Sequence, residues 1–379
     1  MMRKMRLTKL AVICTVLACS TIQAGNWAEF AVDISTDDQQ MPDIHGSTIV
    51  WQQLVAGDWD IYGVDITDPE NPWFFEAAEF ADDQTEPAIY GNTIVWQSFV
   101  ETDWGIYGAD LSNLENDFVI ADIEGSDQQN PAIYENTVVW QDNFDTDWDI
   151  YAADITDPCN VAEFIITPFE DDQQAPAVYG TTAVWQNGTT GDLDIYSTDF
   201  TDPCNPAHWL IAGFDGDQQA AVIYDTTVVW DDNFFGDEDI FAAEIFEPRR
   251  PIEYALTMLS ASQLNPDIDG HLVVWQDNRY GNWDIFGYNL TTGIEFVITD
   301  DPCDQTNPAI SGKTVVWQDN RNGNWNIYAV ILNGPEVAEC TADIQGDVNG
   351  DCKVDLIDFA VMASNWLQCN LEPQEFCRQ

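Results

Sequence analysis

Basic residues are scarce in this chain. Only 11 of its 379 residues are Lys or Arg, against 67 Asp and Glu, which gives a formal net charge of −56. A chain this acidic is repelled by nucleic acid and by anionic membranes, so neither is expected as a partner. High net charge often accompanies disorder, but 45% of the residues are apolar and 16 are Trp, enough to build a core. The charge serves either solubility in a salt-rich medium, which we favour, or a cation-binding surface.

The motifs of familiar catalytic sites are missing as well. The three histidines, His45, His208 and His271, lie far apart in the sequence and share no local motif. No Gly-x-Ser-x-Gly phrase surrounds a serine, and there is no Gly-rich phosphate loop. Carboxylates are abundant, so a glycosidase-type pair of acids stays open as an alternative. The sequence favours a non-catalytic protein over an enzyme.

No apolar run is long enough to span a bilayer. The run Leu10–Ala18 follows a basic stretch and precedes a small-residue cleavage site at Ile22–Ala24. This order predicts a signal peptide over residues 1–24, and therefore a secreted, extracellular or cell-surface protein. A retained anchor is a weaker alternative because the run is short. A lipoprotein with Cys19 lipidated is also weaker, because the residues before Cys19 fit that signal poorly.

Seven of the nine cysteines follow the predicted signal, and an odd number leaves at least one outside any internal bridge. Cys159 and Cys204 occur in the same phrase, Thr-Asp-Pro-Cys-Asn, one repeat apart. Whether they form a bridge depends on their separation in space, which the sequence leaves open.

A phrase close to Val-Trp-Gln recurs along the chain at a period of about 45 residues. Its tryptophans are Trp51, Trp96, Trp140, Trp185, Trp230, Trp275 and Trp317. Each copy contains four short apolar or β-branched runs separated by turn residues, without a helical period. One four-stranded blade of a β-propeller has this length. The repeat therefore predicts an all-β, seven-bladed β-propeller over residues 25–333, with these tryptophans in the blade cores.

The two ends of the repeat array are complementary. The seventh copy has no convincing fourth strand, whereas residues 29–34 match the fourth strand of other copies. We therefore expect the N-terminal strand to complete the last blade and remove the open edges of the array. The phrases at Val274–Arg279 and Asn320–Tyr328 resemble TolB-like propeller repeats. That resemblance covers about residues 28–332, and it implies the fold while leaving the activity open.

Residues 334–345 are expected to be a linker to a small C-terminal module, residues 346–379. The module contains an acidic loop with oxygen-bearing residues at positions 1, 3, 5, 9 and 12 and a backbone carbonyl at position 7. These residues are Asp347, Asn349, Asp351, Asp355 and Asp358, with Lys353 at position 7. Such an oxygen cage suits Ca²⁺, and an amphipathic helix is expected to follow it. An acidic solvated turn is the alternative.

The loop and the expected helix resemble one half of a type I dockerin, which implies calcium as cofactor and the same residues as ligands. The chain has one such unit where a dockerin has two. It also has Cys352 at the sixth loop position, where Gly is usual. Calcium binding is therefore expected, and docking to a cohesin-like partner is not.

Two sets of repeated side chains could form a ligand surface. A Gln before the first strand of each copy either bonds the backbone where the chain crosses between blades, or lines a channel mouth with amides. This set is Gln39, Gln84, Gln128, Gln173, Gln218, Gln263 and Gln305. Tryptophans at the start of third strands could form an exposed aromatic platform, namely Trp59, Trp104, Trp148, Trp283 and Trp325.

Acids such as Asp149 and Asp284, which precede Ile-Tyr or Ile-Phe in several copies, repeat with the architecture and are expected to order loops. We therefore expect a binding or scaffold protein that recognises a polysaccharide or a cell-envelope component and carries a calcium-binding tether. A carbohydrate-active enzyme, either a polysaccharide lyase or a glycoside hydrolase, is the alternative.

Overall fold

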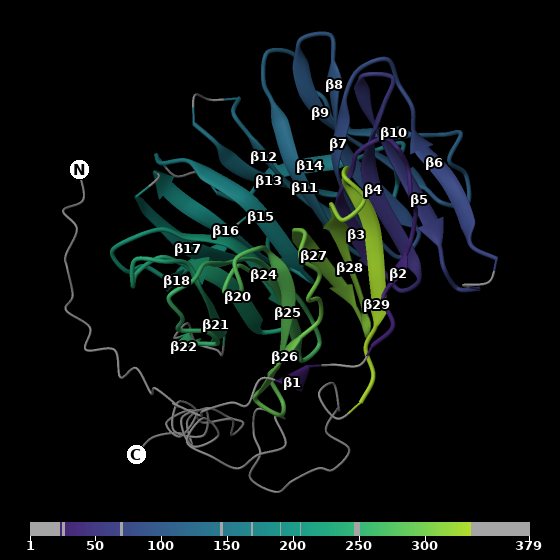
Figure 1. Ribbon diagram of the computed structural model, residues 1–379. Coiled ribbons are helices and arrows are strands. Elements are labelled where there is room, and N and C mark those ends of the chain that lie inside the picture. The colour runs from purple at the N-terminus through teal and green to yellow at the C-terminus, as the bar shows by residue number, and fades with distance from the viewer. Residues whose placement is uncertain are drawn as a thin grey trace, which may run out of the picture.

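The computed structural model describes residues 23–24, 27–68, 71–144, 147–167, 170–189, 191–204, 206–245 and 251–334. Their strands form seven sheets arranged as blades around a central axis (Figure 1). No helix occurs in these ranges, so none there has the length and apolarity to cross a membrane. The all-β, seven-bladed propeller expected from the repeat is confirmed.

Each copy of the repeat forms one blade, and in the last blade the fourth strand comes from the N-terminal segment. Blade I contains β3 (Gln39–His45), β4 (Thr48–Val55), β5 (Asp58–Asp65) and β6 (Trp73–Ala78). Blade II contains β7 (Gln84–Tyr90), β8 (Thr93–Val100), β9 (Asp103–Asp110) and β10 (Phe118–Ala121). Blade III contains β11 (Gln128–Tyr134), β12 (Thr137–Asp142), β13 (Asp149–Asp154) and β14 (Ala162–Ile165). Blade IV contains β15 (Gln173–Tyr179), β16 (Thr182–Thr189), β17 (Asp192–Asp199) and β18 (Ala207–Ala212).

The remaining three blades follow the same order. Blade V contains β19 (Gln218–Tyr224), β20 (Thr227–Asp232), β21 (Asp239–Glu244) and β22 (Ile252–Ala255). Blade VI contains β23 (Gln263–Asp269), β24 (Leu272–Asp277), β25 (Asp284–Asn289) and β26 (Ile294–Val297), with β1 (Gln23–Ala24) parallel to β26. Blade VII contains β27 (Gln305–Ser311), β28 (Thr314–Asp319), β29 (Asn326–Ile331) and β2 (Phe30–Ala31).

The second strand of each blade supplies the core. Its Trp is at most 1% exposed in all seven copies, which confirms the expected blade-core role. In five blades this ring stacks on a third-strand aromatic, as Trp140 does on Tyr151 at 6.2 Å between ring centroids. The flanking Val138 and Val139 are fully buried on opposite faces of the strand. A strand that is apolar on both faces is explained by burial between two neighbouring blades.

The residue after that Trp joins each blade to the next one. Every first strand has a β-bulge whose residue lies near φ +50°, for example Ala175 at φ 50°. The bulged N–H is left outside the ladder, and it donates to a second-strand side chain of the preceding blade. Ala175 N thus donates to Gln141 Oε1 at 2.9 Å. The same bond recurs around the whole ring, with Asp231 in place of Gln as acceptor between blades V and VI.

The N-terminal strand closes the ring as expected. β2 pairs antiparallel with β29, with Phe30 opposite Ala329, and Val32 N donates to Ile327 O at 2.8 Å. In Figure 1 the purple β2 lies beside the yellow-green β29. Arg321 of blade VII adds an ion pair to Glu29 at 2.8 Å.

Several sequence predictions fall outside the described residues. These are nearly all of the predicted signal peptide, almost the entire linker, and the whole calcium loop Asp347–Asp358. Cys159 and Cys204 are described, and both are exposed and unbridged. The bridge between neighbouring repeats that the sequence left open is therefore not formed in this structure.

Candidate functional site in the central channel

The seven recurring glutamines are structural. All seven side chains are fully buried, so they present no amide surface to a ligand. Gln128 Nε2 donates to Ser126 O at 3.0 Å, and its Oε1 accepts from Ile123 N at 3.1 Å. Gln305 Nε2 likewise donates to Cys303 O at 2.7 Å. The sequence interpretation in which this Gln bonds the backbone of the blade-crossing segment is the one that the structure supports.

The third-strand tryptophans are half-buried rather than exposed, and each belongs to a different blade. Their backbone N–H groups donate to Asp carboxylates of the blade-crossing segments, as Trp148 N does to Asp172 Oδ1 at 3.1 Å. The same bond recurs at Trp59, Trp104, Trp283 and Trp325. These bonds hold the start of each third strand against the blade-crossing segment, and the five rings, one in each of five blades, keep part of their surface exposed.

The recurring acid after this position also orders loops. Asp239 Oδ1 accepts from Leu259 N at 2.8 Å and from Thr257 Oγ1 at 3.3 Å. Burial raises the pKa of Asp239 to about 6 and that of Asp284 to about 7. Such raised values occur at catalytic acids, but here they belong to a position that repeats in most blades. The loop-ordering role expected from the repetition is confirmed for Asp239.

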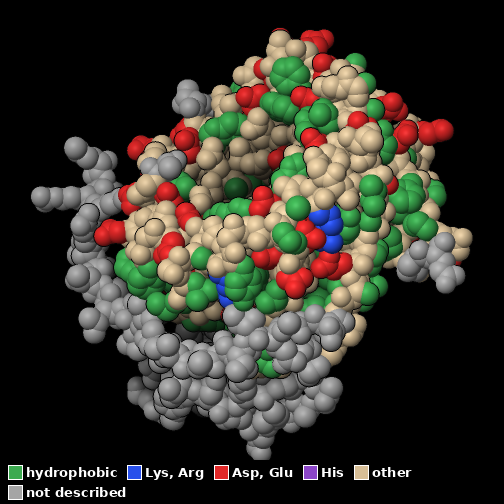
Figure 2. Space-filling view, in the orientation of Figure 1, with side chains coloured by type: hydrophobic (Ala, Val, Ile, Leu, Met, Phe, Trp, Pro, Cys, Tyr) green, Lys and Arg blue, Asp and Glu red, His purple; other side chains and the backbone are tan. Residues whose placement is uncertain are grey.

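The first strands surround the central axis, and Figure 2 shows a hollow in the middle of the ring. Each first strand contacts the first strands of both neighbouring blades. Along each one, residues such as Pro42 and Ile44 are buried, while the alternate residues Asp43 and His45 are half-buried. This alternation turns the third, fifth and seventh residues of each first strand toward the channel. No Lys or Arg occurs in any of the seven first strands.

An arc of aromatic rings lies at one end of the channel. In each of blades I to V the final residue of the first strand contributes one ring. These residues are His45, Tyr90, Tyr134, Tyr179 and Tyr224. Neighbouring rings are tilted by 42–50°, with centroids 4.3–5.0 Å apart. Burial raises the pKa of Tyr90, and neighbouring tyrosines of the arc also contribute to its shift and to those of Tyr134 and Tyr179. We name these five residues the aromatic arc. Each pair adds about 0.5–1.5 kcal/mol beyond its burial, which makes the arc a rigid rim.

The arc is interrupted in blades VI and VII. The same position there holds Asp269 and Ser311, which accept from Gly312 N and from Gly46 N (the latter at 2.9 Å). The charge of Asp269 contributes to raising the pKa of Tyr224, after burial, so the acid lies within electrostatic reach of the arc. Burial lowers the pKa of His45, and Asp269 opposes that effect. This end of the channel thus contains aromatic rings, hydroxyls and one carboxylate.

Further acids lie one layer deeper in the channel. Asp43 Oδ2 accepts from Ile89 N at 2.8 Å, and Asp267 Oδ2 accepts from Ile310 N at 2.7 Å. Each acid therefore bonds the first strand of the following blade. Burial raises the pKa of Asp43 to about 6 and that of Asp267 to about 7. Burial also raises the pKa of Glu86, which faces the channel from blade II. The channel therefore offers hydrogen-bond acceptors and disfavours anions.

Several charged residues of the fifth and sixth copies break the seven-fold pattern, and the described ones do not converge on one site. Arg279 pairs with Asp277 and with Glu295, the latter at 2.6 Å, both within its own blade. Asp231 is buried in the interface between blades V and VI, and Arg249 and Arg250 lie outside the described residues. No group of three or more His, Cys, Asp or Glu in the described ranges could hold a metal ion.

Sequence reasoning missed the aromatic arc, although a signal for it was present. Tyr90, Tyr134, Tyr179 and Tyr224 recur at the repeat period, each directly before the first turn of its copy. His45 begins the same series. In the sequence each first strand is a short apolar run, and its pattern does not distinguish a final Tyr from a core residue.

No family model and no curated protein sequence matches this chain. Solved structures match it at the level of the fold. An oligogalacturonate lyase from Vibrio parahaemolyticus has a TM-score of 0.62 and 11% identity, covering 84% of this chain and 97% of the lyase. A puromycin-hydrolyzing peptidase from Mycobacterium tuberculosis has a TM-score of 0.61 and 14% identity, covering 85% of this chain.

This chain spans only 57% of the peptidase. The β-propeller domain of the Trilobed protease from Pyrococcus furiosus has a TM-score of 0.57 and 12% identity, over 83% of this chain and all of that domain. Identities this low support the fold alone, and propellers host binding proteins and enzymes alike.

Proposed function

We propose that this protein is a secreted or cell-surface, non-catalytic binding protein that recognises a neutral polysaccharide or a hydroxyl-rich cell-envelope component at the aromatic arc. The observation that carries the proposal is the arc itself, a rigid series of tyrosines at the end of a channel that also bears acids. Aromatic rings stack on the apolar faces of sugar rings, while tyrosine hydroxyls and carboxylates accept from sugar hydroxyls. Ser311 and Asp269 leave an opening in the series where a chain could enter.

The repeated polar residues support a binding role over catalysis. Gln128, Asp172 and Asp239 are each used in hydrogen bonds that hold loops, and their counterparts recur by blade. What differs between blades in the channel is the arc, which stops at blade V, together with Asp43, Asp267 and Asp269. A carbohydrate-active enzyme, such as a lyase, is the alternative, and the fold suits it equally. Oligogalacturonate is a polyanion, however, and an acidic channel without Lys or Arg in its first strands would repel it.

The proposal is tested by depletion of the mature chain onto insoluble glucan, mannan, xylan and polygalacturonate. We expect retention on at least one neutral polymer and none on polygalacturonate. The double variant Tyr134→Ala/Tyr179→Ala should weaken retention roughly 10-fold or more, since two stacking rings are removed. Phe144→Ala is the matched control, because Phe144 is 57% exposed and follows the end of β12 that lies opposite the arc. Retention unchanged in the double variant, or turnover of any polymer, would refute the proposal.

We further propose that the C-terminal loop binds one Ca²⁺ and tethers the propeller to a partner. The support is the spacing of oxygen ligands from Asp347 to Asp358. Calorimetry on the full mature chain, with its disulfides intact, should detect one calcium site that Asp347→Ala and Asp358→Ala both abolish. Asp351→Asn, which keeps an oxygen ligand, should only weaken it. If the heat of calcium binding is unchanged in both alanine variants, the C-terminal loop is not the calcium site.

A further inference from the structure

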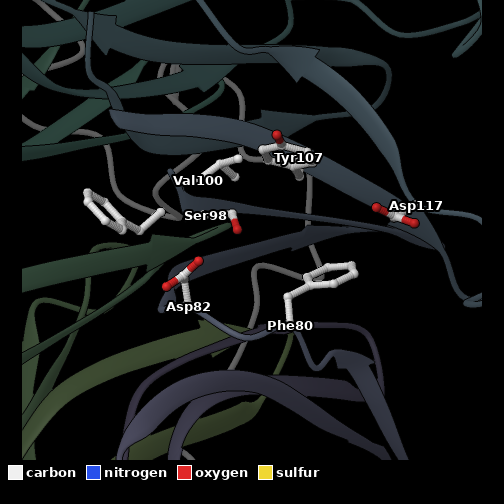
Figure 3. Close-up of a pocket in the computed structure, with 7 residues that line it drawn as sticks. Phe80, Asp82, Ser98, Val100, Tyr107 and Asp117 are labelled. Atoms are coloured by element: carbon white, nitrogen blue, oxygen red, sulfur yellow. The ribbon is translucent and has the colours of Figure 1, made fainter. Parts of the chain in front are cut away.

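A small cavity lies beside blade II, apart from the aromatic arc. Its volume is about 230 Å³, which is suited to one small ring rather than to an extended chain. Phe80, Phe99, Val100 and Tyr107 form its apolar lining, and Asp82, Asp117 and Ser98 add polar groups. Figure 3 shows Phe80 and Tyr107 on opposite sides, with Asp82 and Ser98 toward one end and Asp117 toward the other.

The cavity depends on features that the other blades do not share. The β8–β9 hairpin is longer than those of blades III, V, VI and VII, and its extension places Phe99 opposite Trp104. Their rings contact at 5.4 Å between centroids. The other two long hairpins have Leu54 and Gly188 at that position. Of the three long hairpins, only that of blade II has an aromatic ring at this strand position.

Hydrogen bonds within the protein hold the two aromatic walls of the cavity, Phe80 and Tyr107, in position. Phe80 N donates to Gln84 Oε1 at 3.0 Å, which fixes the blade-crossing segment, while the Phe80 ring remains 45% exposed. The Tyr107 hydroxyl donates to Asp122 Oδ2 at 3.0 Å, and burial raises the pKa of Tyr107 to about 12. Tyr107 is therefore neutral over the physiological range and offers its ring to the cavity. A lining fixed before binding lowers the entropy cost of capturing a ligand.

The chemistry of these walls selects the ligand. Two carboxylates accept hydrogen bonds, a hydroxyl can donate or accept, and no cation lines the cavity, so an anionic ligand is disfavoured. A pyranose ring has apolar faces for Phe80 and Tyr107 and hydroxyls at opposite edges for Asp82 and Asp117. We infer that this cavity is a second carbohydrate subsite, which takes a single neutral pyranose ring. The inference rests on the proposed function but concerns a separate surface.

The test uses the full mature chain and a panel of methyl glycosides, observed by saturation-transfer NMR. The panel contains the α and β methyl glycosides of glucose, galactose and mannose, methyl galacturonate, and methyl glucosaminide. We expect at least one neutral glycoside to bind. Phe80→Ala, which removes one wall, and Val100→Trp, which fills the opening, should each weaken that binding roughly 10-fold. Phe144→Ala is the control, and thermal unfolding verifies that every variant folds.

The outcomes separate this inference from the proposed function. Glycoside binding that is lost in Phe80→Ala and Val100→Trp but kept in Tyr134→Ala/Tyr179→Ala supports a separate subsite. Binding that depends only on the arc residues overturns the subsite and leaves the proposed function standing. Binding of the cationic glucosaminide alone, or of no neutral glycoside at all, also overturns the inference. The polymer depletion described above would still report on the arc in either case.

Discussion

Blades I to V and blades VI and VII share one repeat but use two of its positions differently. At the end of the first strand, blades I to V have an aromatic ring, whereas blades VI and VII have Asp269 and Ser311. After the second strand, blades III and V have exposed Phe144 and Phe234, whereas blades VI and VII have an Arg at the same position.

The side chain of Arg279 folds back over the Phe286 ring at 4.1 Å, and Arg321 does the same over Tyr328 at 4.4 Å. A fixed backbone register thus leaves individual positions free for different tasks. Blades VI and VII use an Arg to form ion pairs within the blade, one of which joins Glu29 of the closing N-terminal segment, and the first five blades direct aromatic rings toward the channel.

The largest effect should come from removing the strand that closes blade VII. Deletion of residues 27–36 removes β2, the Trp27 Nε1 bond to Asn333 O at 2.6 Å, and Glu29, one of the carboxylates that pair with Arg321. The open sheet edge and the lost ion pair should lower the free energy of unfolding by more than about 4 kcal/mol. Urea denaturation measures this loss. Ile34→Ala is the control, since Ile34 is 61% exposed; a deletion as mild as the control would mean that the ring closes without β2.

The next largest effect is expected at Arg279. Its side chain is only 10% exposed and pairs with Asp277, which is fully buried, and with Glu295. Arg279→Ala leaves these carboxylates without their cation and should cost about 3–5 kcal/mol. Phe234→Ala changes the same repeat position in blade V, where the ring is 44% exposed, and should cost less than about 1 kcal/mol. Equal losses in the two variants would erase the distinction between the two groups of blades.

Asp231→Gln should stabilise the protein in a pH-dependent way. In six blades a Gln accepts the bulged N–H of the next blade, and in blade V Asp231 takes its place. Burial raises the pKa of Asp231 to about 7, so the folded state binds a proton more tightly than the unfolded state. The stability contributed at this position therefore falls as pH rises from about 4 to about 7.

Replacement by Gln removes that penalty. We expect a gain of up to about 4 kcal/mol at pH 8 and almost none at pH 4, because the pKa is raised by roughly three units and each unit corresponds to ~1.4 kcal/mol. Thermal unfolding at the two pH values measures the difference. A gain of the same size at both would show that Asp231 does not titrate in this range. Gln276→Glu provides the converse variant, with stability expected to decrease as pH rises.

The smallest effect is expected within the aromatic arc. Tyr134→Phe keeps the rings stacked against Tyr90 and Tyr179 and removes only the central hydroxyl. The loss of one half-buried hydroxyl should lower stability by about 1 kcal/mol or less. Retention on a neutral polysaccharide should fall only a few-fold, far less than in the double alanine variant. A loss as large as in that variant would assign recognition to the tyrosine hydroxyls rather than to the ring faces.

Much of the fold could be predicted because the repeat is strict. Seven buried tryptophans at one period specify seven blades, and the N-terminal strand was identified from its match to other fourth strands. The candidate site was harder to predict. Gln128 and Trp148 repeat as conspicuously as Tyr134, and repetition alone does not distinguish a buried hydrogen-bonding side chain from one that faces the channel. That distinction depends on which way each strand faces once seven sheets are closed into a ring.

The sequence by itself determined the all-β class, the number of blades, the residues of the blade cores and the acidity of the molecule, because these follow from local pattern and composition. Only the tertiary structure decided that Gln141 holds the bulge of the following blade, that Arg321 joins Glu29 near the other end of the chain, and that five aromatic residues from five blades form one arc. These arrangements bring together residues roughly 30 to 300 positions apart. They exist only after the blades pack against one another and, for Arg321 and Glu29, only after the ring closes, because no single repeat contains both partners.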